Sequence, residues 1–366
     1  MYIKSAFMMT WAFGLVSMSP IALSWGYDDK GCLGGPDPVY SNVEFEVKDV
    51  FNPQTNSFDD VVVKAILTQP VARVRSKRNR GCFSLVENPS AVVILHGSGG
   101  IGVRENDNAQ SLQGKHATLT VEMFQGSFGA GTSGRPPLPI FNYTHAFAAL
   151  QYLIDEVGAD PNRIGCMGSS WGAVICNQAA VEKYAQMYGS ELYENDYRFA
   201  AHVARYPVCW ARKLPEKPLP LPLFLVQQAL GLAELGLDFG GDDAPLVGAK
   251  VLVQIGSEDA YDNAEGESGS ETCLELKSSL DASERRLLDV DILSSGTHAF
   301  DRVFTPETSI NDPFARLGSC VVETSLGCLA DPETFPPPSV TITPSQDLAL
   351  QARSKARRFF DRQLLP

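Results

Sequence analysis

The sequence is short of positive charge. Lys and Arg number 30 against 43 Asp and Glu, which gives the 366 residues a formal net charge of −13. Phosphate groups would repel such a surface, so we expect neither nucleic acid nor an anionic membrane as a partner. The sequence also lacks Cys-x-x-Cys pairs and histidine-rich clusters. We therefore expect no metal site and no cofactor.

Ionised residues are missing from Ser5 to Ser24, where large apolar side chains dominate. Ala22 and Ser24 then supply the small residues that signal peptidase recognises. The alternative is an uncleaved membrane anchor, which the glycine, serines and proline among residues 14–20 disfavour. We predict a signal peptide over residues 1–24, a secreted or periplasmic protein, and no stable membrane insertion after cleavage.

Eight cysteines fit an exported protein, because disulfides persist in oxidising compartments. Cys32 and Cys82 are the only two cysteines in the N-terminal part of the chain, so they are natural partners. Cys320 and Cys328 flank a short loop that a disulfide would close. The count alone does not fix the connectivity.

Short apolar runs alternate with segments of helical periodicity along most of the chain. The predicted strands are Val43–Val50, Val61–Leu67, Ala91–Leu95, Thr118–Met123, Arg163–Met167, Phe199–Tyr206, Lys250–Ile255 and Leu287–Leu293. Helices are expected around Phe147–Val157 and over Ala173–Met187. This alternation predicts one α/β domain over residues 25–366, built on a doubly wound, mostly parallel sheet.

Several segments interrupt this pattern. Residues 125–139 are rich in Gly and Pro and predict a loop. Residues 209–248 form a Leu- and Pro-rich insertion, either a lid over the site or an excursion at the sheet edge, and residues 303–342 are irregular. A last helix should follow, with Thr343 as its cap and Pro344 at its first position.

The strongest motif is Gly-Ser-Ser-Trp-Gly over residues 168–172, between a predicted strand and a predicted helix. This is the setting of a Gly-x-Ser-x-Gly nucleophile turn, whose tight backbone needs glycine on both sides of the serine. We therefore predict Ser170 as a nucleophile, with Ser169 as the rival if the motif is misaligned. Cys166 and Cys176 bracket the motif, and we expect both to be free, buried thiols.

A second motif, His-Gly-Ser-Gly-Gly over residues 96–100, directly follows a predicted buried strand. Acyl transfer passes through a tetrahedral oxyanion, and two backbone N–H groups must point at it. Glycines let the chain approach closely enough to supply such a group. We assign the two donors to the amides of Ser98 and Trp171, and we expect His96 to be a structural residue.

The base must be a histidine, and only His298 follows a late strand. His202 lies inside an apolar strand and is expected to be a core residue. The acid should follow the strand before the base, where Asp259 has the best spacing. Glu258 and Asp262 remain alternatives in the same loop.

These motifs resemble the dienelactone hydrolase family of α/β hydrolases. The resemblance lies in the loop at 96–100, the Asp-Pro-Asn-Arg-Ile-Gly…Gly-Ser-Ser-Trp-Gly run at 160–172, Gly-Ser-Glu-Asp at 256–259 and Gly-Thr-His-Ala-Phe at 296–300. It spans roughly residues 60–302. It implies the α/β-hydrolase fold, with insertions near the active site.

The resemblance has two further implications. The founding enzymes of the family use a cysteine nucleophile, and Ser170 stands in its place, which moves the expected substrate from dienelactone towards general carboxylic esters. In one branch a cysteine follows a Tyr-Pro pair, as Cys209 does here, and a second cysteine follows the acid loop. The resemblance therefore implies a Cys209–Cys273 disulfide that pins this loop.

We predict a hydrolase for small-molecule or polymeric carboxylic esters, acting through an acyl-enzyme on Ser170. A peptidase or a polyester depolymerase on the same fold is the first alternative. A non-catalytic binding protein on an inactive hydrolase scaffold is the second. The chain order of Ser170, Asp259 and His298, together with the loop at 96–100, favours an enzyme.

Overall fold

The computed structural model describes residues 33, 35–52, 57–73, 82–124, 135–136, 139–209, 245–262, 271–311, 323–324, 327–328 and 339–366. The predicted signal peptide and most of the predicted insertion at 209–248 lie outside these residues. Within them, no helix is both long and apolar enough to cross a membrane.

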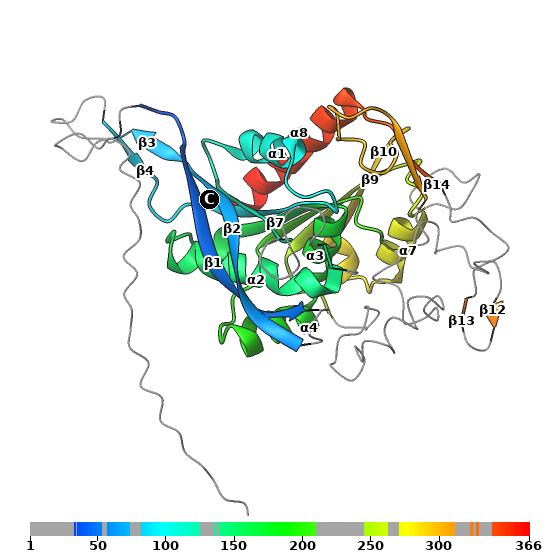
Figure 1. Ribbon diagram of the computed structural model, residues 1–366, viewed down its shortest axis with the longest axis horizontal. Coiled ribbons are helices and arrows are strands. Elements are labelled where there is room, and N and C mark those ends of the chain that lie inside the picture. The colour runs from blue at the N-terminus through cyan, green and yellow to red at the C-terminus, as the bar shows by residue number, and fades with distance from the viewer. Residues whose placement is uncertain are drawn as a thin grey trace, which may run out of the picture.

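An eight-stranded sheet forms the centre of the described chain, in the order β1-β2-β6-β5-β7-β8-β9-β10 (Figure 1). Its strands are β1 Val39–Asn52, β2 Ser57–Gln69, β5 Ala91–Leu95, β6 Ala117–Val121, β7 Ile164–Ser169, β8 Ala201–Arg205, β9 Lys250–Gly256 and β10 Leu288–Leu293. The strands from β6 to β10 pair in parallel, whereas β2 pairs antiparallel with β1 and with β6. The predicted mostly parallel sheet is therefore confirmed.

Helices cover both faces of this sheet (Figure 1). They are α1 Val103–Leu112 and α8 Gln346–Leu364 on one face, and α2 Tyr143–Asp155 and α3 Trp171–Gln178 on the other. The buried strand β5 serves both faces, because successive side chains point to opposite sides. Val92 and Ile94 join the core under α1 and α8, while Val93 and Leu95 join the core under α2.

Smaller elements lie outside the central sheet and its main helices. They are the paired strands β3 Val71–Arg73 and β4 Phe83–Leu85, β11 Thr308–Asn311 and β14 Ser339–Ile342, and β12 Glu323–Thr324 and β13 Gly327–Cys328, the helices α4 Glu182–Tyr184 and α7 Glu271–Ser279, and a π-helix over Ala185–Leu192. The segment predicted as irregular thus contributes an antiparallel ribbon, β11 with β14. This ribbon lies at the β10 side of the sheet (Figure 1).

The helix predicted over Ala173–Met187 is interrupted. α3 ends at Gln178, and Val181 takes an extended conformation and forms an isolated bridge with Leu246. The next N–H, that of Glu182, donates to the Pro245 carbonyl at 2.8 Å. Backbone pairing with a distant segment therefore ends the helix that local periodicity predicts.

The structure tests one expectation about the cysteines. Cys166 and Cys176 form a disulfide with Cα atoms 5.6 Å apart, so the prediction of free thiols is wrong. The reason is that α3 packs back over the strand from which it leaves, which brings the two residues within disulfide reach. Cys82 is also disulfide-bonded, and its expected partner Cys32 lies outside the described residues.

The cap of the last helix differs from the prediction. Ser345, not Thr343, is the N-cap of α8, and its side chain accepts from the Leu348 N–H. The Ser345 N–H itself donates to the Phe300 carbonyl at 2.7 Å, which fixes where the helix begins. Thr343 instead donates its hydroxyl to Glu307.

The docking of α8 gives a test of this packing. Phe360 is fully buried against Gly165 of β7 and Met167, so Phe360→Ala should lower the free energy of unfolding by about 3–5 kcal/mol. Leu350 lies on the same helix with 52% of its surface exposed, and Leu350→Ala should change the free energy of unfolding by less than about 0.5 kcal/mol. Urea denaturation measures both, and similar losses for the two variants would contradict the docking.

Candidate active site

Ser170 lies on the sharp turn between β7 and α3, as predicted. Its φ of 51° is in the left-handed region, where a non-glycine residue is strained. A Cβ added to Gly168 would lie 2.1 Å from the Gly172 carbonyl oxygen, and one added to Gly172 would lie 2.3 Å from the Leu95 carbonyl oxygen. Both flanking positions therefore require glycine for a steric reason. Ser169 is buried, which argues against it as the rival nucleophile.

Ser170, His298 and Asp259 form one chain of hydrogen bonds. Ser170 Oγ lies 2.9 Å from His298 Nε2. His298 Nδ1 lies 2.9 Å from Asp259 Oδ2 and 3.1 Å from Oδ1. Because a carboxylate only accepts hydrogen bonds, the Nδ1 atom carries the proton and Nε2 is free to accept the Ser170 proton.

The loop after β9 puts Asp259 beside His298. The Tyr261 N–H donates to Asp259 Oδ1 at 3.0 Å and fixes the carboxylate. Glu258 is exposed and does not hydrogen-bond to the imidazole, while its N–H donates to the Gly296 carbonyl. A Cβ on Gly256 would lie 2.0 Å from that same carbonyl, so glycine lets the two loops touch. Among the three carboxylates considered from the sequence, Asp259 is the one that contacts the base.

His96 has the structural role that was predicted. Its Nδ1 donates to the Gly97 carbonyl at 2.7 Å, and its Nε2 accepts from the Met123 N–H at 3.0 Å. The His96 carbonyl in turn accepts from the Gly172 N–H at 3.0 Å. This bond ties the start of the loop at 96–100 to the turn that carries Ser170.

The predicted oxyanion donors come from the loop at 96–100 and from the start of α3. Ser98 lines the same cavity as Ser170, and Trp171 is the first residue of α3. Neither backbone N–H group donates to another described residue. The indole Nε1 of Trp171 donates to Asn142 Oδ1 at 3.0 Å, and the Asn142 amide donates to the Met123 carbonyl at 3.2 Å. Buried Asn142 thereby anchors the Trp171 side chain.

The loop over 97–102 also has the glycine spacing Gly-x-Gly-x-x-Gly of a dinucleotide-binding turn. In such a turn the N-terminus of the following helix binds a pyrophosphate. Here the Gly102 N–H at the start of α1 already donates to the Glu105 carboxylate at 2.9 Å. A negative side chain therefore occupies the position that a pyrophosphate would need.

A cavity of about 390 Å³ opens above Ser170. Residues of the segments 97–105 and 298–305 line it. Ile310 of β11 and Ile342 of β14 also contribute to its wall. A ligand in this cavity would reach both the Ser170 hydroxyl and the His298 imidazole.

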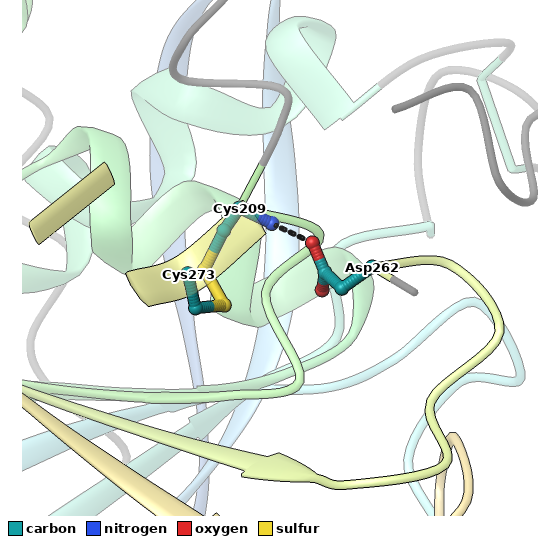
Figure 2. Close-up of side chains that lie close together, drawn as sticks. All are labelled: Cys209, Asp262 and Cys273. Atoms are coloured by element: carbon teal, nitrogen blue, oxygen red, sulfur yellow. Dashed lines mark hydrogen bonds between the residues drawn. A yellow bond between two sulfur atoms is a disulfide. The ribbon is translucent and has the colours of Figure 1, made fainter. Parts of the chain in front are cut away.

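A disulfide and a buried carboxyl group hold the acid loop (Figure 2). Cys209 and Cys273 are joined with Cα atoms 5.0 Å apart, which confirms the implied pairing. Asp262 Oδ1 accepts from the Cys209 N–H at 2.8 Å and from the Thr272 hydroxyl. The two sulfur atoms and the carboxylate lie within 4.8 Å of one another, but sulfur atoms in a disulfide are not metal ligands. The cluster is therefore a structural anchor for the loop that carries Asp259.

The surroundings of Asp262 disfavour its negative charge. Burial, together with the negative charge of Asp259, raises the pKa of Asp262 to about 7. Its Oδ2 atom is buried and has no partner among the described residues. The protonated form of Asp262 is therefore favoured relative to that of an exposed carboxyl group.

A buried ionic network lies behind His298. Arg205, at the end of β8, donates to Asp301 Oδ2 at 2.6 Å, and the Tyr206 hydroxyl donates to Asp301 Oδ1 at 2.6 Å. Arg104 donates to the Tyr206 hydroxyl at 3.0 Å and pairs with Glu105 at 2.6 Å. Burial alone would raise the pKa of Asp301, but the guanidinium groups of Arg205 and Arg104 bring it below its usual value.

Two tyrosine rings flank the imidazole. The Tyr206 ring centroid lies 4.8 Å from that of His298, and the Tyr261 ring centroid lies 4.4 Å away. Sequence reasoning missed Tyr206, Tyr261 and Asp301 as site residues. Their nearness to motif residues was the available signal: Tyr261 follows Asp259 by two positions, and Asp301 follows His298 by three.

His202 is the core residue that was predicted. It is buried in β8, and its Nδ1 donates to the Cys176 carbonyl at 2.9 Å. His145 is also buried, in α2, and burial followed by the effect of His96 lowers its pKa to about 3. Neither lies at the cavity above Ser170.

The raised pKa of Asp262 makes stability depend on pH. Between about pH 4 and pH 7 the folded chain keeps a proton that the unfolded chain releases, so the free energy of unfolding falls as pH rises. Asp262→Asn cannot release this proton. As pH rises, the free energy of unfolding of the variant minus that of wild type should therefore increase by up to about 1.4 kcal/mol per pH unit. Urea denaturation from pH 4 to 8 measures the difference. Glu258→Gln, in the same loop but exposed, is the control, and its difference in free energy of unfolding from wild type should not change with pH. If the difference for Asp262→Asn also does not change with pH, Asp262 is already ionised.

The Arg205–Asp301 pair gives a second test. Asp301→Asn keeps the shape of the side chain but leaves a buried guanidinium without its closest counter-charge. We expect the free energy of unfolding to fall by about 3–5 kcal/mol. Asp289→Asn, at an exposed position of β10, should change it by less than about 0.5 kcal/mol. Equal effects of the two substitutions in urea denaturation would show that the ion pair does not stabilise the fold.

Solved structures of known proteins are similar to this chain. Thermogutta terrifontis esterase 2 phosphoramylated by tabun matches with a TM-score of 0.52 at 14% identity, over 90% of this chain and 97% of that chain. The same esterase phosphorylated by paraoxon gives a TM-score of 0.51 at 14% identity, over 90% and 96%. A dienelactone hydrolase-like promiscuous phosphotriesterase from metagenomic libraries gives 0.46 at 12% identity, over 88% and 98%. No family model matches the chain, and no curated protein matches its sequence.

At such low identities, likeness to a solved structure establishes the fold and leaves the activity open. The match to esterase 2 covers nearly the whole of both chains. It agrees with the parallel strands from β6 to β10 and with the strand–turn–helix that carries Ser170. The chain has the α/β-hydrolase fold.

Proposed function

We propose that this chain is a secreted serine hydrolase, similar to the dienelactone hydrolases, that cleaves carboxylic esters through an acyl-enzyme. The observation that carries the proposal is the line of hydrogen bonds from Ser170 Oγ through His298 to Asp259, which opens into a cavity. A serine hydroxyl is a weak nucleophile until a neighbouring base accepts its proton. This arrangement supplies the base and an acid that orients it.

The reaction proceeds in two halves. As Ser170 Oγ attacks the ester carbonyl carbon, its proton moves to His298 Nε2. His298 then gives that proton to the alcohol oxygen as the carbon–oxygen bond breaks, which leaves an acyl group on Ser170. Water attacks the acyl carbon while His298 takes a proton from it, and the carboxylic acid leaves as the proton returns to Ser170 Oγ. Asp259 accepts the Nδ1–H bond throughout and stabilises the imidazolium.

The tetrahedral intermediate in each half carries a negative oxygen. The backbone N–H groups of Ser98 and Trp171 are its proposed donors, because both lie next to Ser170 and neither has an acceptor among the described residues. The N-terminus of α3 adds a partial positive charge at the same place. The bond from Gly172 N–H to the His96 carbonyl holds the two donor segments together.

Secretion is part of the proposal. The disulfides Cys166–Cys176 and Cys209–Cys273 support it, because such bonds persist in oxidising compartments. The predicted signal peptide over residues 1–24 points to the same conclusion. An esterase shares the fold, so esters are the substrate class that we propose and peptide hydrolysis is the alternative to test.

A fluorophosphonate probe tests the nucleophile. Wild type should be labelled covalently, and Ser170→Ala should not be labelled and should lose p-nitrophenyl acetate hydrolysis by at least about 10³-fold. Ser169→Ala is the matched control, because the neighbouring hydroxyl is buried and should be dispensable. Peptide amides beside the esters test the peptidase alternative. Labelling of Ser170→Ala, or no labelling of folded wild type, would refute the proposal.

A further inference from the structure

Large apolar side chains are exposed around the rim of the Ser170 cavity. Phe304 is 73% exposed, Val103 is 49% exposed and Ile310 is 43% exposed, and all three line the cavity. They come from three separate segments: the loop after His298, the start of α1, and β11. Large apolar groups kept in water around one opening indicate a surface that a ligand covers.

Four of the apolar residues that line the cavity come from the chain after His298. Val303 and Phe304 follow His298 in the same loop, and Ile310 belongs to β11, which pairs with β14. Ile342 of β14 is buried beneath this wall and also lines the cavity. We call Val303, Phe304, Ile310 and Ile342 the apolar wall.

Two of the charged groups that line the cavity, Asp301 and Glu105, are already engaged within the protein, while Arg302, which precedes Val303, is exposed. Asp301 accepts from Arg205 and Tyr206, and Glu105 accepts from Arg104 and from a backbone N–H. Their charges are therefore balanced before any ligand arrives. The exposed surface of Phe304 is not covered in this way. A ligand that removed this surface from water would therefore be stabilised.

Reaction chemistry decides which part of an ester meets the wall. In the proposed reaction, His298 delivers a proton to the oxygen of the leaving alcohol, so that oxygen must lie next to Nε2. The acyl oxygen lies instead towards Ser98 and Trp171, where the proposed oxyanion donors are. The alcohol portion therefore leaves Ser170 next to His298, and Val303 and Phe304 follow His298 in the chain and line the same cavity.

We infer that the apolar wall is the binding subsite for the leaving alcohol, and that the preferred substrates are esters of bulky apolar alcohols, such as arylalkyl or medium-chain alkyl alcohols. This inference rests on the proposed ester hydrolysis and adds the substrate class. Acylation depends on the alcohol, whereas deacylation of a shared acyl group does not. The preference should therefore appear in kcat/KM for a series of esters with one acyl group.

Two ester series separate the alcohol subsite from an acyl subsite. The first contains ethyl, hexyl and 2-phenylethyl acetates, which differ only in the alcohol. The second contains ethyl acetate, butyrate and octanoate, which differ only in the acyl chain. Each rate constant is compared between the full-length wild type and Phe304→Ala, so that the intrinsic reactivity of each ester cancels.

Phe304→Ala should lower kcat/KM for hexyl and 2-phenylethyl acetates by about 10-fold or more and should change ethyl acetate by less than about 3-fold. Its response across the acyl series should be flat. Ile292→Ala is the matched control, because Ile292 is 38% exposed on β10 and does not line the cavity. This control should leave both series unchanged. Free 2-phenylethanol should inhibit wild type more strongly than Phe304→Ala.

Three outcomes would overturn the inference. A uniform loss across both series would make Phe304 a general structural residue. A loss confined to long acyl chains would place the acyl group, and not the alcohol, on the wall. No change in either series would show that the wall does not contact the substrate. By contrast, a folded wild type that hydrolyses no ester in either series would refute the proposed function itself.

Discussion

The buried ion pair between Arg205 and Asp301 links the parts of the site that lie far apart in the chain. The Arg205 carbonyl accepts from the Ser170 N–H at 2.9 Å, while its guanidinium binds the carboxylate that follows His298. One residue at the end of β8 thus contacts both the turn that carries Ser170 and the loop that carries His298. Removing both charges from water is costly, and the neighbouring donors and acceptors, Tyr206 and Gln254, offset that cost by completing the network.

The acid loop is held by different means. A close approach of Gly256 to Gly296 sets its distance from the base loop, and the Cys209–Cys273 disulfide with Asp262 holds its far end. Ionic, steric and covalent constraints therefore each fix one segment of the site. Alignment of three side chains to within a few tenths of an ångström needs this kind of support, because their own hydrogen bonds are individually weak.

Much of the site followed from the sequence, because its signals are local. The apolar run of β5 and the glycines around Ser170 each occupy a few adjacent residues, and strand-end spacing led to Asp259 and His298. What the sequence did not reveal depends on contacts between distant residues.

Arg205 interrupts an apolar strand without any visible partner in the sequence. The break of the predicted helix at Val181 depends on a bridge to Leu246. The Cys166–Cys176 bond was missed because it depends on how closely α3 folds back onto β7. Local patterns predict elements and motifs, whereas these features arise only when elements pack together.

The buried position of Asn142 has a consequence for how the chain can be produced. Residues 142–144 read Asn-Tyr-Thr, the acceptor pattern for N-linked glycans. In the folded chain the Asn142 amide is inaccessible, since it donates to the Met123 carbonyl and accepts from Trp171. A glycosyltransferase acting before folding would place a sugar where the interior has no room and would detach Trp171 from its anchor. During secretion through a eukaryotic pathway, glycan transfer to Asn142 therefore competes with folding. A bacterial host without this modification avoids that competition.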